Sequence, residues 1–330
     1  MKKVSLAFPV YNVEFCVKES LISALNQTYK NIEYIIIDDK GVDGSMAVVY
    51  SILENHARKD SVKIVIHDKN RGHGGAANTA IQNATGDYIF FLDSDDILKD
   101  DAIETLVQLE DNSFDVVIAS YRRINKVKDN NIPFVLQNNS LYRNEDIVKS
   151  YFLSRSFYEM IWGKLYRKDF LVKNDIHLIE NCNHEDPPFT FEVVLCAQRI
   201  RLSSSVIYDW IFRDGSTTSL YKEKNVIDLF LGFCKMLELC RRYRTDDNLS
   251  ILLKYVNNFR LYPIWLLLKN TVQSNQKNDL LRGLMSPILQ FDEVLKFRNP
   301  FNERIKHLIF LLPYTLKKYL LKFISYTQRV

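Results

Sequence analysis

Short apolar runs alternate with longer helix-like stretches through the first third of the chain. The runs are nearly continuous in Ile, Val, Leu, Phe or Tyr, as in strands covered by helices on both faces. Strands that alternate with helices in this way form successive βαβ units and pair in parallel. The pattern therefore predicts an α/β fold with a mostly parallel sheet flanked by helices. The predicted strands are Val4–Val10, Tyr34–Ile37, Val62–Ile66 and Tyr88–Leu92, and the predicted helices are Phe15–Leu25, Ser45–Arg58 and Ala76–Ala84.

The pattern changes twice further along the chain. Phe114–Ala119 is predicted as another strand, and Lys126–Asn131, rich in Lys, Asp and Asn, as an exposed loop. From Asn225 onward the runs are long and helical, at Leu229–Arg242 and Ile251–Thr271, without a strand signal. We expect three parts: an α/β half over residues 1–121, a second half of the same domain over 122–222, and a helical C-terminal region over 223–330.

Composition indicates a globular protein of a reducing compartment. With 330 residues, 47% of them hydrophobic, the chain can bury a sizeable core. The 44 basic residues nearly balance 40 acidic ones, and a net charge of +4 does not indicate a nucleic-acid partner. Five cysteines without C-x-x-C spacing fit the cytoplasm rather than a disulfide framework. No apolar stretch reaches the ~18 residues of a membrane-spanning helix, so we expect any membrane contact to be peripheral.

Carboxylates directly follow two of the predicted strands. Asp93-Ser-Asp-Asp96 follows Tyr88–Leu92, and Asp38-Asp39 follows Tyr34–Ile37. In open α/β sheets the carboxyl ends of the strands form the ligand crevice, so these groups are expected at one edge. Oxygen ligands suit Mg²⁺ or Mn²⁺, which bind one or two carboxylates together with phosphate oxygens. For the D-x-D motif alone, a solvated acidic turn that caps the next helix remains the alternative.

Two other segments offer contacts to a nucleotide. Tyr11, in Pro9-Val-Tyr-Asn after the first strand, could stack on a nucleobase, a contact worth ~1–3 kcal/mol in single-stranded nucleic acids, or could be a half-buried packing residue. The loop Asn70–Gly75 leads into a predicted helix, and its glycines would let backbone N–H groups approach a phosphate. Arg71 adds a permanent charge that can pair with phosphate. A plain tight turn is the alternative for this loop.

Together these motifs resemble the family-2 glycosyltransferases, whose catalytic domain has the GT-A fold. The resemblance covers roughly the first two thirds of the chain, and it implies that Tyr11 and Asp39 hold the nucleobase. It also implies that Asp93 contacts the ribose or sugar and that Asp95 reaches the metal. The expected nucleotide-sugar contacts are Pro9, Tyr11, Asp39, Arg71, Asn78, Asp93 and Ser94. The matching motifs are Phe8-Pro-Val-Tyr-Asn12, Asn26-Gln-Thr-Tyr-Lys-Asn31, Ile37-Asp-Asp39, Asp43-Gly-Ser45, Asn78-Thr-Ala-Ile81 and Ala84-Thr-Gly-Asp-Tyr-Ile-Phe-Phe-Leu-Asp-Ser-Asp-Asp96.

The chain departs from the family pattern in three places. Lys40-Gly-Val replaces the usual Gly-Ser-Thr after Asp39, and Ala77 stands where an Arg usually precedes Asn78. Pro187-Pro188 follow the Glu-Asp pair. Because prolines fix the backbone and remove two donors, we expect a stiffer loop after Asp186 than in relatives.

The resemblance extends to the Glu185-Asp186 pair, and Asp186 is the candidate general base. A carboxylate within hydrogen-bond reach can take the proton of an acceptor hydroxyl as it attacks the anomeric carbon. Direct attack opposite the diphosphate inverts the configuration. A solvated acidic loop is the alternative for this segment taken alone. The expected residues on the acceptor or phosphate side are Trp162, Lys164, Glu185 and Arg213, with core packing an equally good account of Trp162.

The C-terminal segment carries an apolar stripe at helical spacing. Lysines fall off this stripe, and Pro313 should kink or divide the helix. Such a segment could lie on an anionic membrane, or could pack its stripe on the protein or on a second subunit. The stripe comprises Ile305, Leu308, Ile309, Leu312, Leu316, Tyr319, Leu320 and Phe323, and the lysines are Lys306, Lys317, Lys318 and Lys322.

These observations predict an inverting, metal-dependent glycosyltransferase with Mn²⁺ or Mg²⁺ as cofactor. Its donor is expected to be a nucleotide-diphosphate sugar, a UDP-sugar first, and its acceptor a glycan or a lipid-linked glycan of a bacterial surface polysaccharide such as a capsule. We expect it in the cytoplasm, at the inner face of the membrane. A sugar-nucleotide pyrophosphorylase and a non-catalytic nucleotide-sugar-binding protein are the alternatives. The pyrophosphorylase should carry a Gly-rich Arg/Lys loop after its first strand, where this chain has Pro9-Val-Tyr-Asn.

Overall fold

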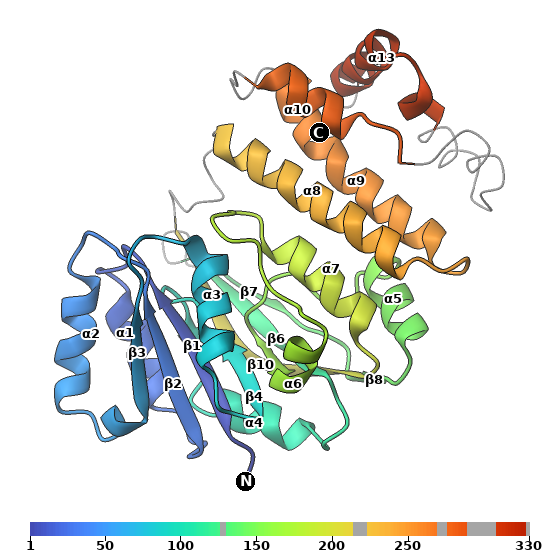
Figure 1. Ribbon diagram of the computed structural model, residues 1–330. Helices are drawn as coiled ribbons and strands as arrows, with labels where there is room; N and C mark the ends of the chain where they lie inside the picture. The colour runs from blue at the N-terminus through green and yellow to red at the C-terminus, as the bar shows by residue number, and fades with distance from the viewer. Residues whose placement is uncertain (126–129, 214–222, 269–275, 289–307, 328–330) are drawn as a thin grey trace. The chain divides into compact units, whose positions relative to one another are not determined.

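A computed structural model describes residues 1–125, 130–213, 223–268, 276–288 and 308–327, with side chains described up to residue 321 (Figure 1). The chain divides into two compact units, Met1–Ser216 and Thr217–Val330. Each unit has its own core and is described by itself.

The first unit is built on one sheet, which has ten strands in the described part of the chain. Its order is β3-β2-β1-β4-β9-β6-β10-β5, while β7 pairs with β6 and β8 with β10. The strands are β1 Val4–Val10, β2 Ile32–Asp38, β3 Val62–Ile66, β4 Tyr88–Phe91, β5 Ile97–Leu98, β6 Val116–Asn125, β7 Asn130–Phe134, β8 Asn139–Leu141, β9 Lys164–Arg167 and β10 Ile200–Phe212.

The half of the sheet formed by β3, β2, β1 and β4 is parallel throughout. Its strands are continuous in apolar residues because both faces are covered, and Leu6, Phe8 and Phe90 have no exposed surface. Beyond β4, strand β9 runs antiparallel between β4 and β6, and β6 pairs in parallel with β10. The predicted α/β fold is confirmed, and the four predicted strand ends do meet at one edge.

Helices cover this sheet, with α3 in front of β1 and β2 in Figure 1. Most predicted helices are present with ends shifted by a few residues. The helices of the first unit are α1 Val17–Leu25, α2 Ser45–Glu54, α3 Gly72–Asn83, α4 Ala102–Leu109, α5 Asn144–Phe152, α6 Lys168–Lys173 and α7 Asp186–Cys196.

The glycine loop before α3 differs from the prediction, because the helix begins at Gly72 and not at Ala76. A Cβ atom at Gly74 would collide with the carbonyl oxygen of Ile179, and one at Gly72 would lie 3.1 Å from the Asn181 Cα. Gly72 also has a φ of +72°, which other residues rarely adopt. The glycines thus let the segment 178–181 pack directly on the first turns of α3.

The prolines after Asp186 also differ from the prediction, because they lie in a helix and not in a loop. Helix α7 begins at Asp186, with Pro187 and Pro188 in its first turn. The first backbone N–H groups of a helix have no partner within the helix, so proline loses nothing there and its fixed φ suits the turn. The prolines therefore belong to the start of α7 and not to a loop.

The second unit is helical in its described residues, as predicted. It comprises α8 Glu223–Tyr243, α9 Leu249–Leu268, α10 Lys277–Leu284 and α13 Tyr314–Thr327. Its buried core includes Phe233, Leu267 and Leu281. Over the described residues, none of the helices combines the length and the apolar character needed to cross a bilayer.

The C-terminal stripe is arranged differently from the prediction. Pro313 does divide the segment, and α13 starts just after it. However, Leu316, Tyr319 and Leu320 are 50%, 74% and 37% exposed, whereas Lys317, expected on the polar side, is 7% exposed. Lys317 is buried because its ammonium donates to carbonyl oxygens of Met285 and Phe310. Of the remaining predicted positions, Ile305 and Lys306 lie outside the described residues, as do the side chains of Lys322 and Phe323.

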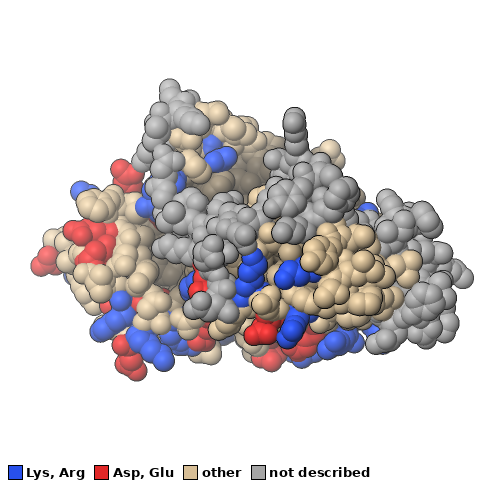
Figure 2. Space-filling view, turned by 90° about the horizontal axis from the view of Figure 1, so that it is seen from above, with Lys and Arg blue, Asp and Glu red and all other residues tan. Residues whose placement is uncertain are grey.

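Charged side chains of both signs lie interspersed over the face that Figure 2 shows. This mixture is that of a solvated surface, unlike the basic stripe typical of nucleic-acid-binding proteins. It agrees with the small net charge of the sequence.

Candidate active site

Three carboxylates lie together at the carboxyl end of β4. One oxygen from each of Asp93, Asp95 and Asp96 lies within 4.8 Å of the others. Asp96 is 1% exposed and accepts hydrogen bonds from the Tyr208 hydroxyl at 2.7 Å and the Ile211 backbone N–H at 2.8 Å. Asp93 and Asp95 are only partly buried. Asp96 therefore anchors the turn, while its two neighbours are open to a ligand.

The electrostatics of this turn favour a cation. Burial, and then the neighbouring Asp95 and Asp93 charges, raise the pKa of Asp96 well above its usual value. Burial followed by the Asp93 charge raises the pKa of Asp95 as well. A bound divalent cation would offset the repulsion between these ionised carboxylates. A donor set made only of oxygens fits Mg²⁺ or Mn²⁺. Asp95 and Asp93 are the residues that would hold it.

Arg213, predicted on the acceptor or phosphate side, lies at this metal side of the site. Its guanidinium forms an ion pair with the Asp95 carboxylate. A second nitrogen of the group contacts the Cys16 sulfur at 2.9 Å. Because Arg213 contacts Asp95, its charge would also act on a ligand bound by that carboxylate.

The two residues expected to hold the nucleobase are an exposed aromatic ring, Tyr11, and a buried carboxylate, Asp39. Tyr11 is 46% exposed after β1, where the half-buried Pro9 lies, and Asp39 is 2% exposed after β2. Asp39 Oδ1 accepts from the His67 ring at 2.6 Å and from the Arg71 backbone N–H at 2.8 Å. Its Oδ2 accepts from the Asn70 amide at 2.9 Å. This network fixes Asp39, and the sequence patterns did not reveal that His67 belongs to it.

Arg71 and Asn78, both predicted to contact the donor, use their polar atoms within the protein. The Arg71 guanidinium forms an ion pair with Glu180 and donates to the Thr79 hydroxyl at 3.0 Å. The Asn78 amide exchanges two hydrogen bonds of 2.9 Å with the backbone of Leu178. Both side chains tie the segment before α7 to α3. The remaining donor candidate, Ser94, is buried within the acidic turn.

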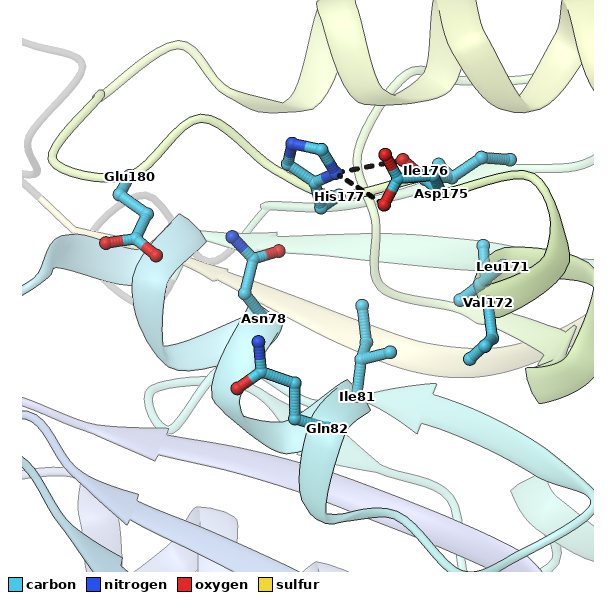
Figure 3. A pocket seen from close by; sticks show the side chains of 9 residues that line it. All are labelled: Asn78, Ile81, Gln82, Leu171, Val172, Asp175, Ile176, His177 and Glu180. Atoms are coloured by element: carbon cyan, nitrogen blue, oxygen red, sulfur yellow. Dashed lines mark hydrogen bonds and ion pairs between the residues drawn. The ribbon is translucent and has the colours of Figure 1, made fainter.

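A surface hollow of about 360 Å³ lies beside this contact, between α3, α6 and the chain that follows α6. Figure 3 shows Glu180 on one side of it and Leu171 on the other, while Asp175 pairs with His177 along a third side. Its lining mixes carboxylates and amides with aliphatic side chains. Among the predicted site residues, Asn78 alone belongs to this lining.

The candidate base is brought close to the acidic turn. The charges that act on Asp186 are those of Glu185, His73, Asp93 and Lys164. Asp186 Oδ1 is buried and has no hydrogen-bond partner among the described residues. Burial and then the Glu185 charge raise the pKa of Asp186 well above 3.8, which His73 and Lys164 only partly offset. A carboxyl with one buried oxygen and a raised pKa beside a cluster of charges is typical of an acid–base catalyst.

Lys164, one of the charges that act on Asp186, is buried, with 2% of its surface exposed. Its ammonium donates to the Tyr158 carbonyl oxygen at 2.8 Å. Burial lowers the pKa of Lys164 from 10.5 to about 7, although the Asp186 and Glu159 charges oppose that change. Its charge therefore acts on Asp186 from within the protein.

Trp162 is 4% exposed and packed among aromatic rings. Its ring stacks on Tyr208 with centroids 4.4 Å apart and planes 8° apart, and it meets the Tyr121 ring edge-on at 4.9 Å. A face covered in this way does not present a platform to a sugar. The structure favours the packing account of Trp162.

His73 was missed by the sequence reasoning, although it lies in the glycine loop already singled out. Its Nδ1 is 2.7 Å from Glu185 Oε1 and its Nε2 is 3.0 Å from Asp93 Oδ1. A neutral imidazole has one N–H group, so only the charged ring donates to both carboxylates. Burial opposes that charge, but Asp93 and Glu185 raise the pKa of His73 well above 6.5.

An acidic turn at the strand ends whose oxygens suit a divalent cation, the exposed Tyr11 ring and the partly buried Asp186 carboxyl are features that a glycosyltransferase site on a GT-A type fold would need. The model of the family described as glycosyl transferase family 2 matches residues 5–171, just over half of the sequence. The chain belongs to this family. The recognised resemblance is thereby confirmed, and the pyrophosphorylase alternative loses its support.

Individual proteins agree with this assignment. The uncharacterized glycosyltransferase YibD of Escherichia coli is 27% identical over 230 residues, which cover 68% of this chain and 65% of YibD, just under two thirds of its length. S. aureus TarS 1–349, solved in complex with UDP-GlcNAc, superposes with a TM-score of 0.72 at 20% identity over 98% of this chain and 90% of that chain. The mannosyltransferase PcManGT of Pyrobaculum calidifontis, solved with GDP-Man and Mn²⁺, reaches 0.57 at 16% identity over 96% and 87%. At these identities the two structures show the fold alone.

Proposed function

We propose that this chain is an inverting glycosyltransferase that moves a sugar from a nucleotide diphosphate to a glycan or lipid-linked acceptor in cell-surface polysaccharide biosynthesis. The observation that supports it most is that the charge of Asp93, in the acidic turn with Asp95, acts on the partly buried Asp186 carboxyl. The acidic turn suits a metal ion with a bound diphosphate, and Asp186 suits proton transfer. Transfer of a sugar to a hydroxyl needs charge neutralisation on the leaving diphosphate and removal of the hydroxyl proton.

A UDP-sugar is the donor we propose, in line with the UDP-GlcNAc bound to TarS. The base would stack on the exposed Tyr11 ring, and Asp39 Oδ2, which holds only the Asn70 amide, would accept from a base N–H. A divalent cation at Asp95 and Asp93 would supply charge neutralisation for the leaving diphosphate. Arg213, which lies at Asp95, would add positive charge on the phosphate side.

Asp186 is the proposed general base. The acceptor hydroxyl oxygen forms its bond to the anomeric carbon as the bond from that carbon to the diphosphate oxygen breaks, and the hydroxyl proton passes to the Asp186 carboxylate. A single displacement inverts the anomeric centre. Because the base works best when its pKa lies near the operating pH, the burial that raises the pKa of Asp186 suits this role.

The donor site is tested by calorimetry with UDP, GDP, CDP and dTDP, first with Mn²⁺ and then with excess EDTA. We expect one diphosphate to bind with the metal, and Asp95→Ala to weaken that binding by about 10- to 100-fold. Asp111→Ala, which changes an exposed carboxylate outside the acidic turn, is the matched control. Failure of the folded wild type to bind any of the four diphosphates would contradict the proposal.

We also propose that α13 lies on the inner face of the cell membrane. Leu316, Tyr319 and Leu320, at i, i+3 and i+4, are exposed on one side of this helix. Apolar side chains on a basic helix favour an anionic lipid surface, where each basic residue adds ~1 kcal/mol. Full-length protein should sediment with phosphatidylglycerol vesicles, and the triple change of these residues to Ser should abolish this. Equal sedimentation of both proteins, or loss of a dimer on substitution, would assign the side chains to protein packing instead.

A further inference from the structure

His73 connects two parts of the site that come from distant points of the sequence. It lies in the first turn of α3, whereas Asp93 follows β4 and Glu185 directly precedes α7. Each ring nitrogen faces one carboxylate oxygen, at 3.0 Å for Asp93 and 2.7 Å for Glu185. Both polar atoms of the ring are thus committed to carboxylates of the site.

Three of the ties between the start of α3 and the segment 178–186 follow one another along that segment, and the contact of His73 with Glu185 is the last of these three. The first joins Asn78 to the backbone of Leu178, and the second is the hydrogen bond of 2.9 Å from Asn181 N–H to the Arg71 carbonyl. The glycines of α3 allow this close approach, because side chains there would collide with the segment. The third tie holds the residue immediately before Asp186.

We propose that His73 is a positioning residue that holds Glu185, and with it Asp186, at a fixed separation from Asp93. The proposal rests on the proposed function for the roles of Asp93 and Asp186. In a single displacement the acceptor oxygen, the anomeric carbon and the leaving oxygen must be aligned, and a displacement of about 1 Å can cost about 100-fold in rate. A ring that contacts the donor-side carboxylate and the base-side carboxylate together sets that alignment.

Two substitutions separate the two contacts of His73. The amide nitrogen of Asn occupies nearly the position of Nδ1, so His73→Asn keeps the bond to Glu185 and loses the one to Asp93. The amide nitrogen of Gln occupies nearly the position of Nε2, so His73→Gln keeps the bond to Asp93 and loses the one to Glu185. His177→Gln is the matched control, because His177 lies directly before this segment, is exposed and pairs with Asp175.

Hydrogen exchange of the peptide that covers residues 178–189 measures the tie without any substrate. A hydrogen bond to a charged group contributes about 1.5–3 kcal/mol, so its loss in His73→Gln should speed exchange in this peptide by about tenfold or more. His73→Asn and His177→Gln should exchange at nearly the wild-type rate. Equal exchange in His73→Gln and His73→Asn would overturn the proposal.

Turnover tests the consequence for alignment, with UDP release from UDP-GlcNAc in the presence of Mn²⁺ as the assay. His73→Gln should bind UDP within about twofold of wild type while its turnover falls about 10- to 100-fold. Adding Glu185→Gln to His73→Gln should cost little more, because the two residues act through one contact. Additive losses would overturn the proposal. If wild type neither binds nor releases UDP, the proposed function fails. The difference in hydrogen exchange between His73→Gln and His73→Asn still tests the contact of His73 with Glu185.

Discussion

Lys164 in the first unit and Arg260 in the second are both buried cations, but their partners differ. Lys164 is 2% exposed and lies within the field of the Asp186 and Glu159 carboxylates. Arg260 has no exposed surface, donates to the carbonyl oxygens of Leu284 and Ser286, and lies 3.4 Å from the centre of the Phe310 ring. No carboxylate acts on Arg260 within the described part of the chain.

This difference separates a cation that serves the fold from one that we propose serves the site. The last carbonyl groups of a helix lack partners, and Arg260 and Lys317 supply donors at the end of α10, where the helix dipole favours positive charge. Lys164 instead lies beside a carboxyl whose pKa is also shifted, and such pairs mark sites where protons move. Burial of a charged side chain does not by itself indicate a functional site. Whether its neighbours are carbonyl groups or ionisable carboxyls is the better indicator.

The largest expected effect is on the base. Asp186→Asn keeps the shape of the side chain and removes its ability to accept a proton, so turnover should fall ~10²–10⁴-fold while UDP binding with Mn²⁺ is retained. Single-turnover sugar transfer and calorimetry measure the two quantities. An unchanged rate would remove Asp186 from the mechanism, and loss of UDP binding would favour a non-catalytic nucleotide-sugar-binding protein.

Arg260→Met should act on stability and not on the site. The substitution leaves the Leu284 and Ser286 carbonyl oxygens without their donor, and an unsatisfied buried polar group costs about 1–3 kcal/mol. We expect a lower Tm for the transition of the second unit, with UDP binding unchanged. An equal or higher Tm would mean that the cost of burying the charge outweighs its hydrogen bonds.

Lys164→Met should shift the pH profile, which is the smallest of the three effects. Turnover requires ionised Asp186, so it falls as the pH drops through the raised pKa of that residue. The positive charge of Lys164 lowers that pKa, and its removal should raise it, moving the acid limb of the profile to higher pH by about one unit. Rates between pH 4 and 9 measure the limb, and the exposed Lys173→Met is the control. A shift to lower pH would contradict this.

Features that depend on a few adjacent residues were predictable from the sequence. The strands β1 and β3 have the predicted ends, because continuous apolar runs bounded by polar residues are local signals. The acidic turn of Asp93 to Asp96 was found because it directly follows such a run. The start of α3 was not, since glycine disfavours helix and only the packing of residues 178–181 explains it.

Side-chain partners were the least predictable part of the site. Arg71 and Asn78 were expected at the donor, and the fold commits both to the segment before α7. Lys317 was expected on a polar face and is buried against carbonyl groups. In each case the deciding partner lies tens to a hundred residues away in the sequence.

The order of apolar runs, glycines and acidic turns along the chain determined the α/β class, the edge of the sheet that carries the site and the family. These are consequences of local burial and spacing, which act over a few residues. Only the tertiary structure decided that His73 joins Glu185 to Asp93 and that the Lys164 charge acts on Asp186. Partners and pKa values depend on the distances between separate elements, and packing alone sets those distances.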